Sequence, residues 1–314
     1  MDIITANNLT KTYKSYKNAA GFLKREAVVV NAVDGVSFDV EEGAVCGLLG
    51  PNGAGKSTTV KMLCGALFPS GGELSVMGYS PASERKKYVA QIGAVFGQKS
   101  QLIWDIPPMD SFKMNRAIYG IPKTKFTDIL EELSVLLNIS EEMEKPARVL
   151  SLGERMKCEF IMAMLHDPKV VFLDEPTIGL DMIAKSGVRT FIKKMNARGA
   201  TFVLTTHDLE DVERLAGHII IINHGKKVFD DSLVNLRRRV GNKKQIGLTL
   251  HTPPPPGALD DLTVTSRASD LEMTLETDAP DVGNFMESLF ARFTVRDISV
   301  KEPPMEEIIG ALYL

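Results

Sequence analysis

The residues with the clearest chemical potential form a glycine-rich stretch at positions 50–58. The stretch fits the pattern of a glycine, four free positions and then Gly-Lys-Ser, which is typical of loops that hold nucleotide phosphates. Because glycine has no Cβ, the backbone N–H groups of such a loop can approach phosphate oxygens closely. Lys56 is expected to reach the β- and γ-phosphates, and the hydroxyl of Ser57 to ligate Mg²⁺. The predicted phosphate-binding residues are Gly50, Pro51, Asn52, Gly53, Ala54, Gly55, Lys56, Ser57 and Thr58.

Two adjacent carboxylates, Asp174 and Glu175, end the apolar run at 170–173. Neighbouring residues of a strand point to opposite faces, so the two acids can serve different partners. Beside a phosphate loop, Asp174 is predicted to hold Mg²⁺ and Glu175 to polarise an attacking water as general base. The alternative, two acids that are simply solvated, does not account for the phosphate loop upstream.

These chemical groups require a framework, and the apolar pattern indicates which one. Residues 45–49 predict a short buried strand before the glycine loop, and a helix is expected from Thr58 onward. Helical stretches alternate with continuous β-branched runs at 170–173, 201–205 and 217–222. Such runs are typical of a mostly parallel sheet covered on both faces, so an α/β fold is predicted. A helix-rich stretch at about 110–167 is expected to form an inserted helical subdomain.

The chain is predicted to contain two domains, residues 1–238 and 239–314. Four consecutive prolines at 253–256, followed by a shift toward acidic residues, mark the change of character. The second domain is expected to be a small α+β domain, with strands at 262–265, 271–275 and 295–300 and an amphipathic helix at 282–292. Because this domain carries no evident catalytic constellation, a structural or dimerisation role and a ligand-sensing role both stay open.

Composition places the protein among ordinary globular chains. It has 314 residues, of which 44% are hydrophobic and 25% charged, and a net charge of −3. Since there is no basic excess, no nucleic-acid partner is predicted. Three cysteines without metal-ligand spacing, Cys46, Cys64 and Cys158, are expected to be buried thiols in a reducing compartment. No signal peptide or bilayer-spanning apolar run is visible, so a membrane role would require a separate partner chain.

The order of further motifs resembles that of ATP-binding cassette (ABC) proteins. Residues 150–154, with the sequence LSLGE, resemble the signature sequence of that family, and residues 179–181 resemble the loop after its catalytic glutamate. His207 is similar to the family's switch histidine and Gln98 to its lid glutamine. Tyr13 stands where the family places an aromatic residue against adenine.

The resemblance covers residues 1 to about 235 and implies a P-loop NTPase cassette fold that binds ATP and Mg²⁺. Within it, the ring of Tyr13 would stack on the adenine base, and Asp181 would belong to the nucleotide-binding residues. His207 would hydrogen-bond the γ-phosphate and the attacking water. The implied catalytic residues are Glu175, His207 and Gln98. The implied metal ligands are Ser57, Gln98 and Asp174.

The signature residues imply a second subunit. Ser151 and Gly153 precede a helix, and a hydroxyl, a backbone N–H and a helix N-terminus together form an anion site. In ABC proteins this site closes on ATP held by the facing subunit, so a dimer of two cassettes, identical or different, is implied. Leu152 replaces the first glycine of the usual pair, and Glu154 replaces glutamine. Since Ser151 and Gly153 are retained, a competent site is expected.

The closer resemblance is to cassettes that pair with exporter-type permeases for drugs, lipids or polysaccharides. It is carried by residues 96–105 and 177–181 and by a C-terminal domain that ends in residues 302–309. It implies an ATPase that energises a separate transmembrane permease from a peripheral position on the cytoplasmic face of the cell membrane. ATP binding would close the dimer and hydrolysis would reopen it. Two alternatives stay open: a soluble cassette ATPase without a transport role, and a regulatory module that uses nucleotide only as a dimer switch.

Two further segments are candidates for contact with a membrane partner. Segment 100–108 contains the only tryptophan, Trp104. With Phe112 and Tyr119, it is expected either to line a groove for a short permease helix or to pack within the helical subdomain. Segment 13–28 is longer than the family's usual link and carries basic residues, so it is expected to lie near anionic lipid or to form a solvated loop.

Overall fold

The computed structural model describes residues 1–18, 25–97, 99–239, 243–277, 282–302, 305–310 and 312. The chain divides into two compact units, Met1–Ser232 and Leu233–Leu314. The second unit begins with helix α8 (Leu233–Arg239), and residue 238 of the predicted boundary lies within this helix.

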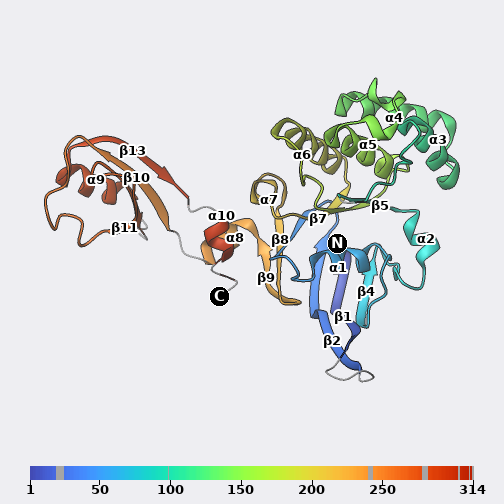
Figure 1. Cartoon of the computed structure of the whole chain (residues 1–314), viewed down its shortest axis with the longest axis horizontal. Helices are drawn as coiled ribbons and strands as arrows, with labels where there is room; N and C mark the ends of the chain where they lie inside the picture. The colour runs from blue at the N-terminus through green and yellow to red at the C-terminus, as the bar shows by residue number, and fades with distance from the viewer. Residues whose placement is uncertain are drawn as a thin grey trace. The chain divides into compact units, whose positions relative to one another are not determined.

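A six-stranded sheet carries the predicted site of the first unit (Figure 1). Its strands lie in the order β5-β6-β7-β3-β8-β9, and all are parallel to their neighbours except β9, which pairs with β8 in the antiparallel sense. In chain order they are β3 (Val45–Leu49), β5 (Ile92–Phe96), β6 (Val170–Asp174), β7 (Thr201–Thr205), β8 (His218–Asn223) and β9 (Lys226–Ser232). The strands predicted from the apolar runs are therefore confirmed.

Both faces of this sheet are buried, as the continuous apolar runs predicted. Along β6, Val170 and Phe172 belong to one core and Val171 and Leu173 to another, because successive strand residues point to opposite faces. The first core also takes in α1 (Lys56–Leu63). The second core takes in α5 (Leu152–Met164) and α6 (Met182–Ala197).

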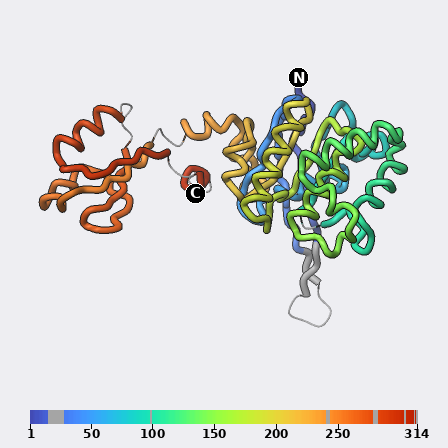
Figure 2. Tube along the Cα trace, turned by 90° about the horizontal axis from the view of Figure 1, so that it is seen from above, coloured from blue at the N-terminus to red at the C-terminus, as the bar shows by residue number. Residues whose placement is uncertain are grey.

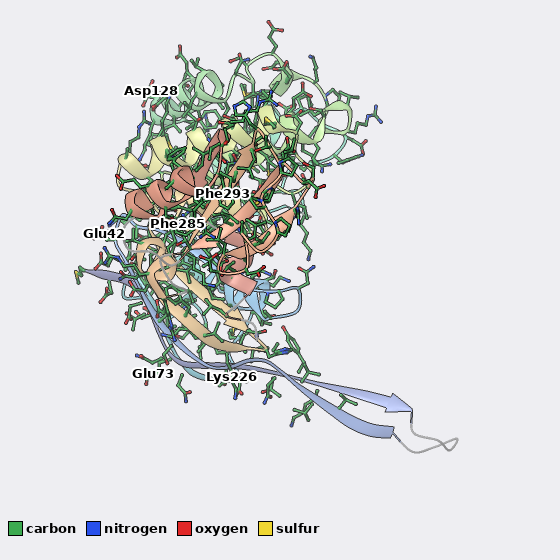
Figure 3. The ribbon with its side chains drawn as sticks, turned by 90° about the vertical axis from the view of Figure 1, so that its left-hand side faces the viewer. Glu42, Glu73, Asp128, Lys226, Phe285 and Phe293 are labelled. Atoms are coloured by element: carbon green, nitrogen blue, oxygen red, sulfur yellow. The ribbon has the colours of Figure 1, made fainter. Side chains whose placement is uncertain are left out.

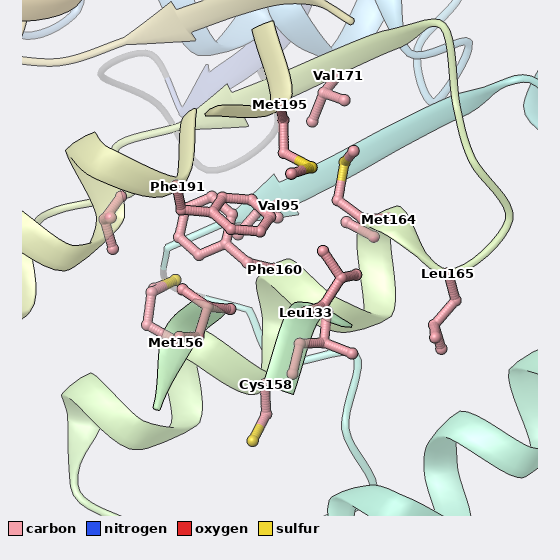
Figure 4. Close-up of a cluster of buried hydrophobic side chains, with 14 of the residues drawn as sticks. Val95, Leu133, Met156, Cys158, Phe160, Met164, Leu165, Val171, Phe191 and Met195 are labelled. Atoms are coloured by element: carbon pink, nitrogen blue, oxygen red, sulfur yellow. The ribbon is translucent and has the colours of Figure 1, made fainter. Parts of the chain in front are cut away.

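A helical subdomain covers the second of these faces (Figure 1). It consists of α3 (Pro108–Tyr119), α4 (Lys123–Leu137), the 3-10 turns Glu142–Glu144 and Ala147–Val149, and α5. Figure 4 shows its core, in which the rings of Phe160 on α5 and Phe191 on α6 pack at a centroid distance of 5.3 Å. The inserted subdomain expected at about 110–167 is thus confirmed. The remaining helices of the unit are α2 (Arg85–Val89) and α7 (Leu209–Leu215).

A three-stranded antiparallel sheet completes the first unit, in the order β2-β1-β4. Its strands are β1 (Asp2–Asn18), β2 (Arg25–Glu41) and β4 (Gly71–Val76). The interpretation of segment 13–28 as a loop is wrong for the described residues, because β1 and β2 pair as far as Asn18 and Arg25. Figure 3 shows this hairpin running away from the rest of the unit. Residues 19–24 and the side chains of 15–18 and 25–27 lie outside the described part.

The second unit contains a four-stranded antiparallel sheet in the order β11-β12-β10-β13. Its elements are β10 (Lys244–Leu250), β11 (Thr263–Arg267), β12 (Glu272–Thr277), α9 (Val282–Arg292), β13 (Val295–Lys301) and α10 (Met305–Gly310), besides α8. Helix α9, red in Figure 2, packs on one sheet face through Leu289, and Phe293, directly after the helix, belongs to the same core. Strand β10 was not predicted, whereas the other three strands and α9 were. Among the described residues, no helix combines the length and apolar composition that crossing a bilayer requires.

Candidate active site

The glycine loop joins β3 to α1, and two of its glycines are required by close backbone contacts. Gly50 and Gly55 have φ angles of 151° and 110°. A Cβ on Gly50 would lie 2.1 Å from the carbonyl oxygen of Ile222, and one on Gly55 would lie 2.3 Å from that of Ala32. Any side chain would therefore push the loop away from the neighbouring strands.

The ammonium group of Lys56 is held inside the loop. Its Nζ donates to the carbonyl oxygens of Gly50 at 2.6 Å and Pro51 at 3.2 Å, and the residue is buried. Burial lowers the pKa of Lys56, an effect that the nearby charges of Glu175 and Asp174 oppose. The loop therefore presents a desolvated cation at the position where a phosphate-binding lysine is required.

Asp174 and Ser57, two of the predicted metal ligands, lie within hydrogen-bond distance of each other. The hydroxyl of Ser57 donates to Oδ1 of Asp174 at 3.0 Å. A second hydroxyl, that of Thr205 at the end of β7, donates to the same oxygen at 2.6 Å. Thr205 was not predicted as a site residue. Its signal in the sequence is a polar residue at the end of a buried apolar run, on the strand that proves to be the neighbour of β6.

Glu175 and His207 form a close pair. Oε2 of Glu175 lies 2.7 Å from Nδ1 of His207, and the carboxylate is mostly buried whereas the imidazole is exposed. Glu175 has a φ angle of 54°, a conformation that non-glycine residues rarely adopt. Its backbone N–H donates to the backbone and hydroxyl oxygens of Thr205, each at 3.1 Å. Thr205 therefore orients both acids of the site.

The loop, Glu175 and His207 line one cavity of about 640 Å³. Ala32 of β2 and Ile178 also line it, and neither was predicted. Tyr13 is not among the lining residues. It lies exposed on β1, paired with Val30, with Nζ of Lys11 5.5 Å from its ring centroid. Its stacking on adenine stays a prediction.

The signature residues lie at the start of α5, and none of them lines the loop cavity of the same chain. Ser151 caps the helix: its Oγ accepts from the N–H of Glu154 at 3.3 Å, and Oε2 of Glu154 accepts from the N–H of Ser151 at 2.8 Å. This backbone hydrogen bond lowers the pKa of Glu154. At Gly153, a Cβ would lie 3.2 Å from Cβ of Ala184, which is a tight contact. The unusual Glu154 thus closes a capping box.

Asp181 caps the next helix, α6. Its Oδ1 accepts from the N–H of Ala184 at 2.8 Å, and Asp181 is not among the residues that line the loop cavity. Within one chain its visible role is therefore to begin α6, and nucleotide contact by Asp181 stays a prediction.

Gln98 lies outside the described residues. The segment that follows it is anchored by Glu159, a buried residue of α5 that sequence reasoning did not select. The carboxylate of Glu159 accepts from the hydroxyl of Ser100 at 2.5 Å and from the N–H of Gln101 at 2.9 Å. Since α5 also begins with the signature residues, this contact connects the two motifs.

The residues expected to line a permease groove separate into two sets. Phe112 is fully buried in the helical core, and the ring of Tyr119 stacks on that of His166 at 4.1 Å, so for these two the packing interpretation is correct. Ile103 and Trp104 are exposed, with the guanidinium of Arg155 5.4 Å from the Trp104 ring. Only this second set is available to a partner.

Comparison with known proteins agrees with this geometry. The family model described as "ABC transporter" matches residues 33–178. The ATP-binding protein NatA of Bacillus subtilis (strain 168) is 31% identical over 208 residues, which are 66% of this chain and 85% of NatA. The Nod factor export ATP-binding protein I of Ralstonia nicotianae is 33% identical over 196 residues, 62% of this chain and 61% of that protein.

One similar protein also covers part of the second unit. The linearmycin resistance ATP-binding protein LnrL of Bacillus subtilis (strain 168) is 28% identical over 290 residues, which are 88% of this chain and 91% of LnrL. Among solved structures, an ATP-binding subunit of an ABC transporter has a TM-score of 0.65 at 24% identity, over 76% of this chain and 92% of that one. The latter match shows a shared fold. The chain therefore belongs to the family of ABC transporter ATP-binding subunits, the ATPases that energise a separate membrane permease.

Proposed function

We propose that this subunit binds Mg²⁺–ATP in the cavity of the glycine loop and hydrolyses it with Glu175 as general base. The observation that carries the proposal is the Glu175–His207 pair, 2.7 Å apart on the wall of the cavity that the loop also lines. A carboxylate held by an imidazole is oriented to accept a proton from water. His207 is exposed, so its second ring nitrogen is accessible to a γ-phosphate.

The oxygen ligands near the loop fit Mg²⁺. Among the described residues, no three His, Cys, Asp or Glu side chains gather into a metal site. Mg²⁺ is usually bound by one or two protein ligands together with substrate phosphates and water. Ser57 and Asp174, whose oxygens are 3.0 Å apart, would supply these one or two protein ligands. When bound, the ion would neutralise charge on the phosphates.

The remaining loop residues would bind and orient the triphosphate. Lys56 would exchange its hydrogen bonds to Gly50 and Pro51 for phosphate oxygens. Because Lys56 is buried, its charge acts in a medium of low dielectric constant and attracts a phosphate more strongly than an exposed lysine would. Tyr13 would stack on the adenine base from β1, the neighbour of the strand β2 whose Ala32 lines the cavity.

We further propose that each complete site needs two cassettes. Ser151 caps α5 and does not line the loop cavity of its own chain, which supports a role on ATP held by a facing subunit. A similar solved structure, 21% identical with a TM-score of 0.63, is a dimeric cassette in a post-hydrolysis state bound to ADP and Pi. ATP would then close the dimer, and hydrolysis would reopen it.

For the partner and direction we propose an exporter-type permease that holds the subunit at the cytoplasmic face of the membrane. Relatives named for Nod factor export, bacitracin transport and linearmycin resistance support this assignment. The exposed Ile103 and Trp104 offer an apolar contact for a short permease helix.

The nucleotide assignment is tested by Lys56→Ala and by removal of metal. ATP affinity of the full chain, measured by equilibrium binding, should fall at least tenfold in Lys56→Ala, since roughly 1.4 kcal/mol or more of phosphate contact is lost. Chelation of Mg²⁺ should stop turnover, and its readdition should restore it. Unchanged affinity in Lys56→Ala would contradict the proposal.

The transport assignment is tested by co-purification with the candidate permease encoded beside this chain. Trp104→Ala should weaken the complex without changing ATP affinity. The matched control is Ile118→Ala, which also shortens an exposed apolar side chain, on α3. If no permease associates with the full chain in a membrane extract, the transport assignment is wrong.

A further inference from the structure

A buried carboxylate, that of Asp211 on α7, contacts the two loops that follow β6 and β7 and carry the proposed catalytic pair, Glu175 and His207. Asp211 is fully buried and Arg189 on α6 is nearly so. Nε of Arg189 donates to Oδ1 of Asp211 at 2.5 Å. Helices α6 and α7 lie side by side (Figure 1), and this ion pair joins them.

The second oxygen of the same carboxylate contacts both loops. Oδ2 of Asp211 accepts from the hydroxyl of Thr177 at 2.5 Å and from the hydroxyl of Thr206 at 3.4 Å. Thr177 is two residues after Glu175, and Thr206 immediately precedes His207. Both threonines are buried. One carboxylate therefore connects the chain on each side of the Glu175–His207 hydrogen bond.

Further ion pairs surround this centre and restrict its movement. Lys185 on α6 donates to Oδ2 of Asp208 at 2.5 Å, and Nη1 of Arg189 lies 2.9 Å from Glu210. A buried acid that has lost a partner leaves an uncompensated charge or acceptor, so such a group holds its neighbours in one arrangement. The two helices, and with them the two loops, are thereby fixed relative to each other.

We propose that Asp211, held by Arg189, positions His207 against Glu175 by binding Thr177 and Thr206. None of these four positioning residues lines the loop cavity; they act through the spacing of the two loops. The inference rests on the catalytic roles proposed for Glu175 and His207. It also gives Thr177 a part in the reaction that its sequence position alone does not indicate.

The test is the steady-state ATPase activity of the full chain carrying Thr177→Val, which removes the hydroxyl and keeps the side-chain volume. We expect kcat to fall roughly three- to tenfold, the range that loss of one buried hydrogen bond produces, with KM for ATP within about twofold of wild type. Thr177→Ser should restore kcat. Wild-type kcat in Thr177→Val, or no recovery in Thr177→Ser, would overturn the proposal.

A double-mutant cycle with His207→Ala tests whether the role of Thr177 is purely structural. If Thr177 acts by placing His207, then Thr177→Val should cause no further loss of kcat once the imidazole is absent. Additive losses would refute the positioning role. Thr206→Val, on the other loop, should behave in the same way and provides the test if Thr177→Val does not fold.

The matched control is Thr190→Val, on the same helix as Arg189. Among the residues that the structure describes, the exposed hydroxyl of Thr190 bonds only to the carbonyl oxygen of Ser186 in its own helix, so kcat should not change. Failure of the proposed catalytic function can be told apart from failure of the positioning role. Turnover that survives Glu175→Gln disproves the catalytic assignment. Loss of turnover in Glu175→Gln with wild-type kcat in Thr177→Val disproves only the positioning role.

Discussion

At the scale of single residues, the site is a set of polar side chains already bound to one another. Ser57 binds Asp174, and Glu175 binds His207. Their types and places in the motifs were enough to predict them. Thr205 was not predicted, because its contact with both acids depends on β7 lying next to β6, which a linear sequence does not state.

Glu154 is the residue whose sequence interpretation the structure changes most. In the sequence it is only a departure from the family's usual glutamine, whereas in the structure its carboxylate is bound to the N–H of Ser151. Glutamine closes the same capping box. We therefore expect Glu154→Gln to leave ATPase activity equal to that of wild type or higher, measured as phosphate release at saturating ATP. A large loss would show that the negative charge itself is needed.

At the scale of elements, the alternation of side chains between the two faces of a strand decides which helices pack on each face of the sheet. The alternation of Val170 and Phe172 against Val171 and Leu173 places one set of helices on each face of the sheet. Continuous apolar runs made these strands predictable. The outer part of the β1–β2 hairpin was not predicted, because residues 14–18 and 25–27 are mostly basic or polar and carry no apolar alternation.

The packing of α6 on α5 gives a stability prediction. Phe191 is fully buried against Phe160, so Phe191→Ala should lower the free energy of unfolding of the full chain by about 3–5 kcal/mol through lost burial and a cavity. Denaturation with urea measures this change in the free energy of unfolding. Lys193→Ala, an exposed position of the same helix, is the control and should change stability by less than about 0.5 kcal/mol. Equal effects would contradict the assigned packing.

The edge of the sheet gives a prediction about pH. Burial alone would raise the pKa of Asp230, but hydrogen bonds from His218 at 2.7 Å and Lys227 at 2.6 Å hold it below its ordinary value of 3.8. An acid with a depressed folded-state pKa stabilises the fold above its ordinary pKa and loses that effect as the pH falls through the folded value. Asp230→Asn should therefore cost more unfolding free energy at pH 7 than at pH 3; an equal cost at both would refute the pairing.

At the scale of the whole molecule, the proposed active site needs two chains. The loop cavity contains no signature residue of its own chain, and the resemblance of the motifs to those of ABC proteins was enough to predict this separation. The role of the second unit was not predictable, because its sequence carries no catalytic motif and its strands form a sheet whose order follows from pairing over long separations.

The two-cassette arrangement predicts an ATP-dependent change of mass. If hydrolysis reopens the dimer, Glu175→Gln with Mg²⁺–ATP should remain closed, at about twice the 34.5 kDa of one chain. Light scattering after gel filtration measures the mass. The double variant Glu175→Gln, Ser151→Ala should stay closer to the monomer mass, since the facing hydroxyl is lost. A Glu175→Gln chain that stays monomeric with ATP would contradict the shared site.

The central claim, that the glycine loop holds ATP and Glu175 activates water, is tested most directly by ATP binding and turnover of Glu175→Gln measured side by side. The account predicts that kcat falls at least about 100-fold, the contribution of a general base. ATP affinity should stay within about threefold of wild type, because the phosphate contacts of the loop are intact. Turnover near that of the wild type, or loss of ATP binding in parallel with turnover, would contradict the account.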